Sequence, residues 1–226
     1  MRQRKSKKIL LYFFLLIMLG TINNNYLNKL DLPILKNIQV LGLNEETNKK
    51  IANDLFFLKF QNIFLLKSSQ IKKIINRNTF VENYSVFKVF PSTIVIKIEK
   101  TKILANLYRN GSNYFFGSNG KLIKAENKKN DKPFLFGDFT NEEFLKFKKI
   151  IDESKLRYSD IKKIYFFNSK RWDIELFNGL LIRLPEKKLL ESLNLSADLI
   201  LNNNFKNIKI IDARVNNQVI LNEKRR

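Results

Sequence analysis

The side chains that could carry out chemistry in this 226-residue chain are its carboxylates, because histidine and cysteine are both absent. Without them the chain has neither the usual general base of hydrolases nor the imidazole and thiolate ligands of most protein zinc sites. A hydrolase could still use a pair of carboxylates as acid and base. The candidates are Asp138, Glu142, Glu143, Asp173 and Glu175.

The positions of these carboxylates indicate structural roles instead. Glu142 and Glu143 follow Thr140 at the start of an expected helix, where the helix dipole favours negative charge. Asp173 is expected to lie opposite Arg183 on a neighbouring strand, which gives it a partner of opposite charge. We therefore expect no catalytic residue, no cofactor and no metal site, and interpret the chain as non-enzymatic.

The chain is strongly basic, with 42 Lys and Arg against 21 Asp and Glu and a formal charge of +21. Such a charge could attract nucleic acid, anionic lipid or an acidic wall polymer. The basic residues are spread along the chain rather than gathered on one expected helix. We therefore expect neither nucleic acid nor a small-molecule substrate as partner. The alternative function is a membrane-anchored basic module that binds anionic lipid, wall polymer or nucleic acid.

The amino-terminal segment has the charge asymmetry of a membrane anchor. Residues 1–8 carry five basic side chains, and the run 9–22 that follows is apolar. As a helix this run spans about 21 Å against a hydrocarbon core of about 30 Å, a length that also fits a signal peptide; extension to Leu27 gives about 28 Å. Residues 20–25 contain no small-x-small cleavage site. We expect a cytoplasmic tail at 1–8 and an uncleaved transmembrane helix at 9–27.

Residues 33–104 have the pattern of a small domain in the order β-α-α-β-β. The expected elements are a strand at 36–41, a helix capped by Asn44, a helix capped by Ser68 or Ser69, and strands at 81–89 and 93–99. In the last strand Ile94, Ile96 and Ile98 share one face, as a half-buried antiparallel sheet requires. This order resembles that of a POTRA module, a small protein-docking domain.

Residues 105–221 are expected to form a β-rich domain, followed by a short tail at 222–226. Tight Gly turns at 110–111 and 119–120 separate its first short strands. The remaining expected elements are a helix capped by Thr140, a hairpin at 172–184, a helix near 186–201 and a strand at 208–215.

The hairpin at 172–184 has a register that its side chains specify. A two-residue loop at Asn178 and Gly179 would mix apolar and polar faces, whereas a three-residue loop at 177–179 separates them. The longer loop sets Trp172, Ile174 and Leu176 opposite Leu184, Ile182 and Leu180. We predict a bulged turn with Gly179 at positive φ, and Trp172 as a core residue.

Four runs of residues resemble the FtsQ/DivIB family of bacterial cell-division proteins. They are 88–99, with a basic residue, an aromatic and a proline before an alternating strand that ends in Glu; 132–137, with a proline, apolar residues and a glycine; 171–185, with Arg-Trp, Asn-Gly and Leu-Pro around a hairpin; and 211–214, with Asp, an apolar residue and Arg. The motif positions with expected structural roles are Lys88, Phe90, Pro91, Glu99, Trp172 and Gly179. The resemblance covers nearly all of the chain after residue 33.

The resemblance implies an α+β protein with one amino-terminal transmembrane helix, a POTRA-like domain and a mainly antiparallel β domain with flanking helices. It implies a non-catalytic divisome scaffold in the inner membrane, with the amino terminus cytoplasmic and the bulk periplasmic. Its implied partners are FtsB-like and FtsL-like single-pass division proteins, bound by strand addition during septum formation. The matching positions are Val215, Val219 and Leu221, with Asp212 and Arg214 as supports.

Overall fold

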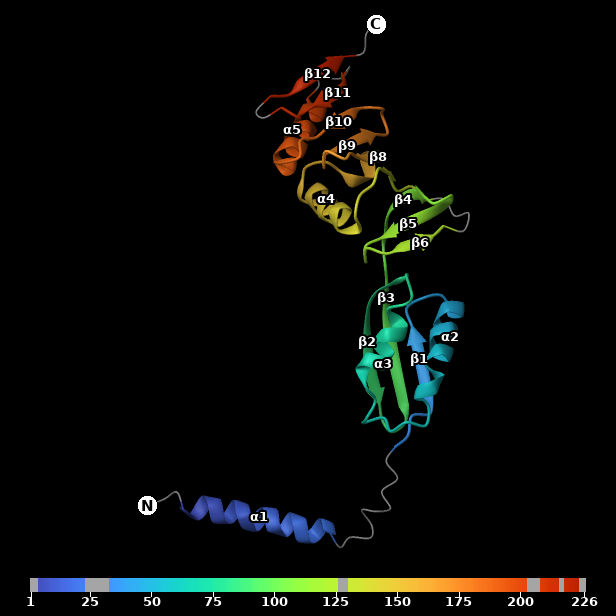
Figure 1. Cartoon of the computed structure of the whole chain (residues 1–226), viewed down its shortest axis with the longest axis vertical. Coiled ribbons are helices and arrows are strands. Elements are labelled where there is room, and N and C mark those ends of the chain that lie inside the picture. The colour runs from blue at the N-terminus through green and yellow to red at the C-terminus, as the bar shows by residue number, and fades with distance from the viewer. Residues whose placement is uncertain (1–3, 23–32, 126–129, 203–207, 216–217, 224–226) are drawn as a thin grey trace.

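The first helix of the chain carries the apolar run. The structure is a computed structural model that describes residues 4–22, 33–125, 130–202, 208–215 and 218–223 (Figure 1). Helix α1 (Arg4–Ile22) includes part of the basic segment that we expected as a separate tail. Among the described helices, none reaches the combination of length and apolar content that a bilayer-spanning helix requires. Residues 23–27, which we assigned to the same anchor, lie outside the described residues.

A small unit with its own core follows. Its elements are β1 (Asn37–Leu41), α2 (Glu45–Asp54), η2 (Phe56–Leu58), α3 (Ser68–Ile75), β2 (Val81–Val89) and β3 (Thr93–Lys100). The expected order β-α-α-β-β is confirmed. The strands form a sheet in the order β1-β3-β2, in which β2 is antiparallel to β3 and β1 is parallel to it. Ile94, Ile96 and Ile98 lie on the buried face, where residues of both helices cover them.

The two helix caps expected in the small unit are wrong in detail. Asn44 occupies the N-cap position of α2, but its side chain makes no capping hydrogen bond. Asn48 bonds instead to the backbone nitrogen and oxygen of Leu43. The N-cap of α3 is Lys67, whose backbone is extended, so Ser68 already lies in the helix. A residue with helical backbone cannot be the cap, since an N-cap has non-helical dihedral angles.

The large unit is a nine-stranded mixed sheet with two helices. Its strands are β4 (Ile103–Arg109), β5 (Ser112–Gly117), β6 (Leu122–Lys124), β7 (Phe134–Phe136), β8 (Ile161–Phe166), β9 (Trp172–Leu176), β10 (Leu181–Arg183), β11 (Ile208–Asp212) and β12 (Ile220–Glu223). The strand order is β12-β11-β10-β9-β8-β7-β4-β5-β6. Most pairs are antiparallel, as expected, but β4 with β7, β7 with β8 and β10 with β11 are parallel. Helices α4 (Asn141–Glu153) and α5 (Leu189–Leu201) connect the second and third of these parallel pairs.

The core of the large unit centres on Trp172. The indole is 4% exposed and stacks on Phe147 of α4, with ring centroids 4.5 Å apart. The expected cap of α4 is confirmed as a capping box, in which Thr140 and Glu143 bond each other's backbone nitrogen. The cap fixes the start of α4, and the buried stripe of this helix, which includes Phe144, then faces the indole.

The register predicted for the hairpin of β9 and β10 is confirmed. Ile182 pairs with Ile174 and Arg183 with Asp173. Residues 177–179 form the loop. Leu176 donates its backbone N–H to the carbonyl oxygen of Leu180, Gly179 donates to the carbonyl oxygen of Leu176, and Gly179 has a φ of 85°.

The two units lie end to end (Figure 1). Side-chain hydrogen bonds join them. Asn119, in the turn between β5 and β6, donates to the carbonyl oxygens of Thr79 (2.9 Å) and Val81 (2.8 Å). The Lys121 ammonium donates to the carbonyl of Asn76 at 2.8 Å. The turn predicted at residues 119–120 therefore serves as the contact between the units.

Candidate partner-binding edge

The large sheet ends on β12, which pairs on one side only, with β11. Within the part of the chain that the structure describes, no strand pairs with its other side. An edge strand of this kind presents unpaired backbone N–H and C=O groups that another chain can use. Strand β12 lies at the end of the large unit farthest from the small unit (Figure 1).

The predicted partner-binding residues lie at this edge, but two of them face inward. Leu221 pairs with the buried Ile211, and Val219 and Leu221 pack against the core of the large unit. Their neighbour Ile220 is 56% exposed. Val219 and Leu221 therefore hold β12 to the sheet, while Ile220 presents its side chain outward. Sequence reasoning missed Ile220, although the alternation of a half-buried strand would have indicated it.

Val215 and Val219 line a small pocket of about 150 Å³ beside the first turn of α5. Val215 is 48% exposed, and Leu195 of α5 lines the same pocket and is 47% exposed. Two of the predicted residues thus meet in one hollow next to the open strand. The lining is mixed, because polar and charged side chains stand beside these apolar ones: Lys188, Glu191, Ser192 and Gln218.

Asp212 and Arg214 fix the chain where it leaves β11. The guanidinium of Arg214 donates Nε to Oδ1 of Asp212 at 2.7 Å and Nη2 to Oδ2. Arg183 Nη1 lies 3.6 Å from Oδ2. The hydrogen bonds from Arg214 lower the pKa of Asp212 below its ordinary value. The pair is therefore charged at neutral pH and stabilises the segment that leads to β12.

A basic hollow of about 480 Å³ lies over strands β8, β9 and β10 of the sheet. Three arginines line it, Arg171, Arg183 and Arg214, together with the carboxylates Asp173 and Glu175. Arg171 Nε and Asp173 Oδ1 are 3.4 Å apart, and both are buried without a hydrogen-bond partner. Burial raises the pKa of Asp173. The hollow therefore favours an incoming acidic or hydrogen-bonding group.

Two of the carboxylates that we considered for hydrolysis, Glu175 and Asp173, are engaged in other interactions. Glu175 accepts hydrogen bonds from Tyr165 at 2.7 Å and Lys163 at 3.1 Å, and the bond from Tyr165 lowers its pKa. Asp173, on the same face of β9, has Arg171 and Arg183 as charge partners. Opposite pKa shifts in one hollow are typical of acid and base pairs, but ion-pair networks produce them too. Here each carboxylate already has a cationic neighbour.

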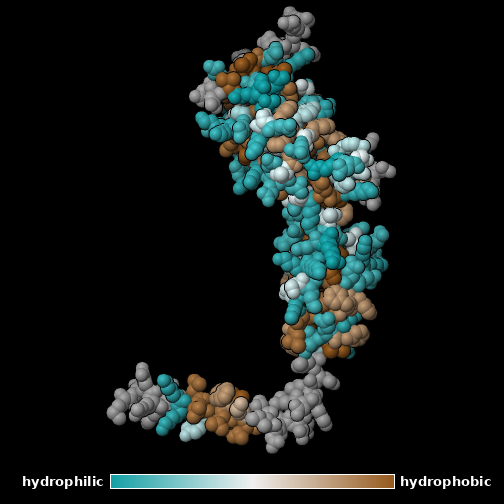
Figure 2. Space-filling view, in the orientation of Figure 1, coloured by the Kyte–Doolittle hydropathy of each residue, from teal (hydrophilic) through white to brown (hydrophobic). Residues whose placement is uncertain are grey.

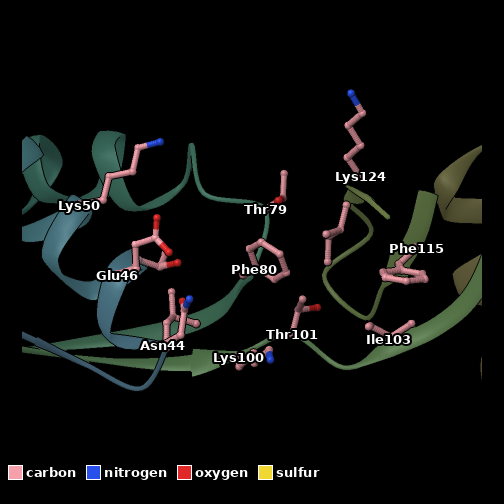
Figure 3. Close-up of a pocket in the computed structure, with 13 residues that line it drawn as sticks. Asn44, Glu46, Lys50, Thr79, Phe80, Lys100, Thr101, Ile103, Phe115 and Lys124 are labelled. Carbon is pink, nitrogen blue, oxygen red and sulfur yellow. The ribbon is translucent and has the colours of Figure 1, made fainter. Parts of the chain in front are cut away.

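A cavity of about 630 Å³ lies between the two units (Figure 3). Lys50 and Glu46 of α2 border it on one side, and Lys124 and Phe115 of the large unit border it on the other. Among the described residues that line it, Glu46 is the one carboxylate, so it lacks an acid and base pair. Across the described ranges of the chain, no group of three His, Cys, Asp or Glu side chains is placed to hold a metal ion.

Three motif residues of the small unit, Lys88, Phe90 and Pro91, lie at its end opposite the cavity. Phe90 and Pro91 form the turn between β2 and β3, with a cis peptide bond between them. The Lys88 ammonium donates to the carbonyl oxygen of Phe64 at 3.3 Å, and the rings of Phe64 and Phe90 stack at 4.9 Å. Glu99 lies near the other end of β3, where it pairs with Asn83.

Comparison with known proteins assigns both units. A family profile described as "POTRA domain, FtsQ-type" matches residues 34–100, and one described as "Cell division protein FtsQ/DivIB, C-terminal" matches residues 105–214. The chain is 26% identical over 198 residues to the cell division protein FtsQ of Rickettsia bellii (strain RML369-C), covering 79% of this chain and 69% of that protein. The solved extracytoplasmic domain of the trans isomer of DivIB from Geobacillus stearothermophilus is 17% identical, with a TM-score of 0.36, over 48% of this chain and 99% of that one. On the two profile matches, the chain belongs to the FtsQ/DivIB family of cell-division proteins.

Proposed function

We propose that this cell-division protein is a non-catalytic scaffold that binds FtsB-like and FtsL-like single-pass proteins through the open side of β12. The observation that carries the proposal is that β12 pairs on one side only among the described strands, at the edge of the sheet whose residues 105–214 match the FtsQ/DivIB profile. An added strand would use the free backbone groups of β12. Such a scaffold would recruit and regulate other membrane division proteins during septum formation.

In this proposal the chain is held in the inner membrane by its amino-terminal segment, with residues 1–8 cytoplasmic and the bulk periplasmic. The support is the asymmetry between the basic segment and the apolar run after it, because positive flanks stay in the cytoplasm. Residues 33–104 would form the docking domain and residues 105–221 the partner-binding domain.

The edge also favours a particular partner chemistry. Ile220 would contact an apolar side chain of the added strand, while Val215 and Val219 would contact its continuation. The hollow lined by Arg183 and Arg214 lies over β8, β9 and β10, and it would favour an acidic residue in a part of the partner that reaches past β11. Asp212 then supports the edge by holding Arg214 in place.

The test is co-purification of the full chain, in detergent, with the FtsB-like and FtsL-like proteins of the same organism. We expect Ile220→Glu to abolish the complex, because it places charge on the face that receives the strand without disturbing the core. Tyr108→Glu is the matched control, since Tyr108 is 66% exposed on β4, away from β12 in the sheet. A complex that survives Ile220→Glu contradicts the edge assignment, and no complex with the unchanged chain contradicts the partner assignment.

Salt distinguishes this proposal from the alternative, a basic module that binds anionic lipid, wall polymer or nucleic acid. The charge of +21 favours that alternative. Binding through screened surface charge falls steeply with ionic strength, whereas a backbone ladder with apolar contacts does not. Association that disappears in salt and ignores Ile220→Glu would favour the electrostatic function.

A further inference from the structure

The small unit exposes an apolar surface at the end where the chain enters it from residue 33. Figure 2 shows hydrophobic residues gathered at this end, away from the large unit. The exposed residues that form this surface, here called the tip, are Ile34, Phe56, Phe57, Phe60, Phe64, Leu65, Val89 and Phe90. Soluble monomers rarely expose so much contiguous apolar surface unless something binds it.

Backbone hydrogen bonds place the three segments of the tip side by side. Phe60 donates its backbone N–H to Leu35, and Leu35 donates to Gln61. Lys36 donates to Ser92, which follows the turn at Phe90. The tip is thus a fixed surface built from segments 33–36, 55–67 and 87–93.

The charge of the tip has one sign. Segments 33–36, 55–67 and 87–93 contain four lysines, Lys36, Lys59, Lys67 and Lys88, and no Asp or Glu. The Lys59 ammonium lies over the ring of Phe56, 5.0 Å from its centroid. Aromatic side chains mixed with lysine are typical of protein surfaces that rest in the interface of an anionic membrane.

Phe60 is held in a conformation that costs stability. Its φ is 68°, a region unfavourable for a bulky residue, and its ring is 70% exposed. The other described non-glycine residues with positive φ are polar: Asn110, Lys170 and Lys188. Neither the backbone nor the ring of Phe60 therefore benefits the protein in water. Strain of this kind is retained where it serves a function.

We propose that the tip docks into the lipid surface of the membrane, with its phenylalanines at the boundary between headgroups and acyl chains and its lysines on anionic headgroups. The inference rests on the proposed anchor, because α1 and the tip are separated by ten residues, 23–32, whose extended reach is about 35 Å. A tether of that length keeps the tip near the membrane at all times. Docking would then orient the small unit, and the large unit joined to it, relative to the bilayer.

The absence of cysteine allows a direct test with the full chain. Three single-cysteine variants are labelled with a fluorophore: Leu65→Cys at the tip, Lys187→Cys in the large unit and Leu16→Cys in α1. Each is reconstituted into vesicles of phosphatidylcholine and phosphatidylglycerol that carry a nitroxide on the acyl chain. We expect quenching at positions 65 and 16 but not at 187. In phosphatidylcholine alone we expect the docked-to-undocked ratio to fall by about fivefold for each lysine that touches the surface.

Phe60→Asn separates docking from folding. Asparagine tolerates positive φ, so Tm is expected to stay the same or rise, while the docked-to-undocked ratio falls by about tenfold through loss of one buried ring. Phe177→Asn is the control, because Phe177 is 59% exposed in the distant hairpin of the large unit. It is expected to leave the quenching unchanged.

The outcomes decide the two proposals separately. Quenching at position 16 but not at 65 overturns docking and leaves the anchor intact. Quenching at 65 but not at 16 supports docking and contradicts the anchor, and the absence of both overturns both. If the fluorescence at position 65 changes with the protein-to-lipid ratio and not with the lipid nitroxide, the tip binds a second copy of the chain. That result overturns lipid docking.

Discussion

Arg214 binds both carboxylate oxygens of Asp212, two residues before it, through Nε and Nη2 of its guanidinium. The backbone N–H of Arg214 also donates to Oδ1 of Asp212 at 3.2 Å. The pair closes a short loop where β11 ends, so a single charged unit determines how the chain turns toward β12. Its contribution should therefore depend on pH.

We expect Asp212→Asn to lower the free energy of unfolding by about 1–2 kcal/mol at pH 7. Since the folded-state pKa of Asp212 is lowered, its contribution is present above the unfolded-state pKa of about 3.9 and is lost as pH falls through the folded-state pKa. The difference from the unchanged protein should thus vanish in acid. Urea unfolding followed by Trp172 fluorescence at pH 7 and at about pH 2 measures it. The exposed pair of Lys155 and Asp198 supplies the control Asp198→Asn, and an equal difference at both pH values contradicts the prediction.

Removal of the Asn119 amide should loosen the contact between the units. Asn119→Ala deletes two hydrogen bonds to the backbone of the small unit, and we expect a loss of about 1–3 kcal/mol and a broader range of interdomain distances. Small-angle scattering of the full chain in nanodiscs measures the distances. Asn178→Ala, which removes a side-chain bond within the distal hairpin, is the control. Identical scattering for both variants would contradict the role of Asn119 in holding the two units together.

Two glycines with positive φ should respond differently to alanine. A Cβ at Gly42 would lie 1.8 Å from the carbonyl oxygen of Ile98. A Cβ at Gly179 would have no heavy atom of the described residues within 4 Å, apart from its own residue and its two chain neighbours. Gly179→Ala should therefore cost only the backbone strain, about 1–2 kcal/mol, and Gly42→Ala more than about 3 kcal/mol. Denaturant unfolding followed by circular dichroism compares them. Equal losses in the free energy of unfolding would show that β3 can move away from residue 42 at little energetic cost.

Trp172→Ala should destabilise the large unit by about 3–5 kcal/mol, because the indole is buried against Phe147, Phe139 and Phe166. Trp172→Phe keeps a stacked ring and should cost less than half as much. Thermal unfolding of the two variants tests the order. Similar losses in both would indicate that the size of the indole matters more than its stacking.

Periodicity and turn chemistry predicted much of the fold. The alternation of Ile94, Ile96 and Ile98 located β3 and its buried face, and the separation of apolar and polar faces determined the register of the hairpin at Gly179. The cap of α4 by Thr140 was predicted correctly, although the reciprocal bond from Glu143 was not. These features are local, so nearby residues specify them.

The parts that failed depend on residues far apart in the sequence. The parallel pairs of the large sheet, such as Ile182 with Ile211, are decided by how α5 packs. The inward direction of Leu221 follows from its pairing with Ile211, which the end of the chain alone does not show. The tip was missed because each phenylalanine in 56–64 is typical of a core, and only the folded backbone shows that the neighbouring Leu58 and Ile63 fill that core.

The two-residue link of Thr101 and Lys102 between β3 and β4 has a mechanical consequence. If the two ends of the molecule are pulled apart, the load crosses this link and the few side-chain bonds around Asn119, while the strands on either side are held by whole ladders. The hydrogen bonds donated by the side-chain amide of Asn119 should therefore break first, and the molecule should lengthen at the junction between the units before either sheet unfolds. The protein would behave as two rigid domains in series, joined by a contact that breaks under a lower force than either domain.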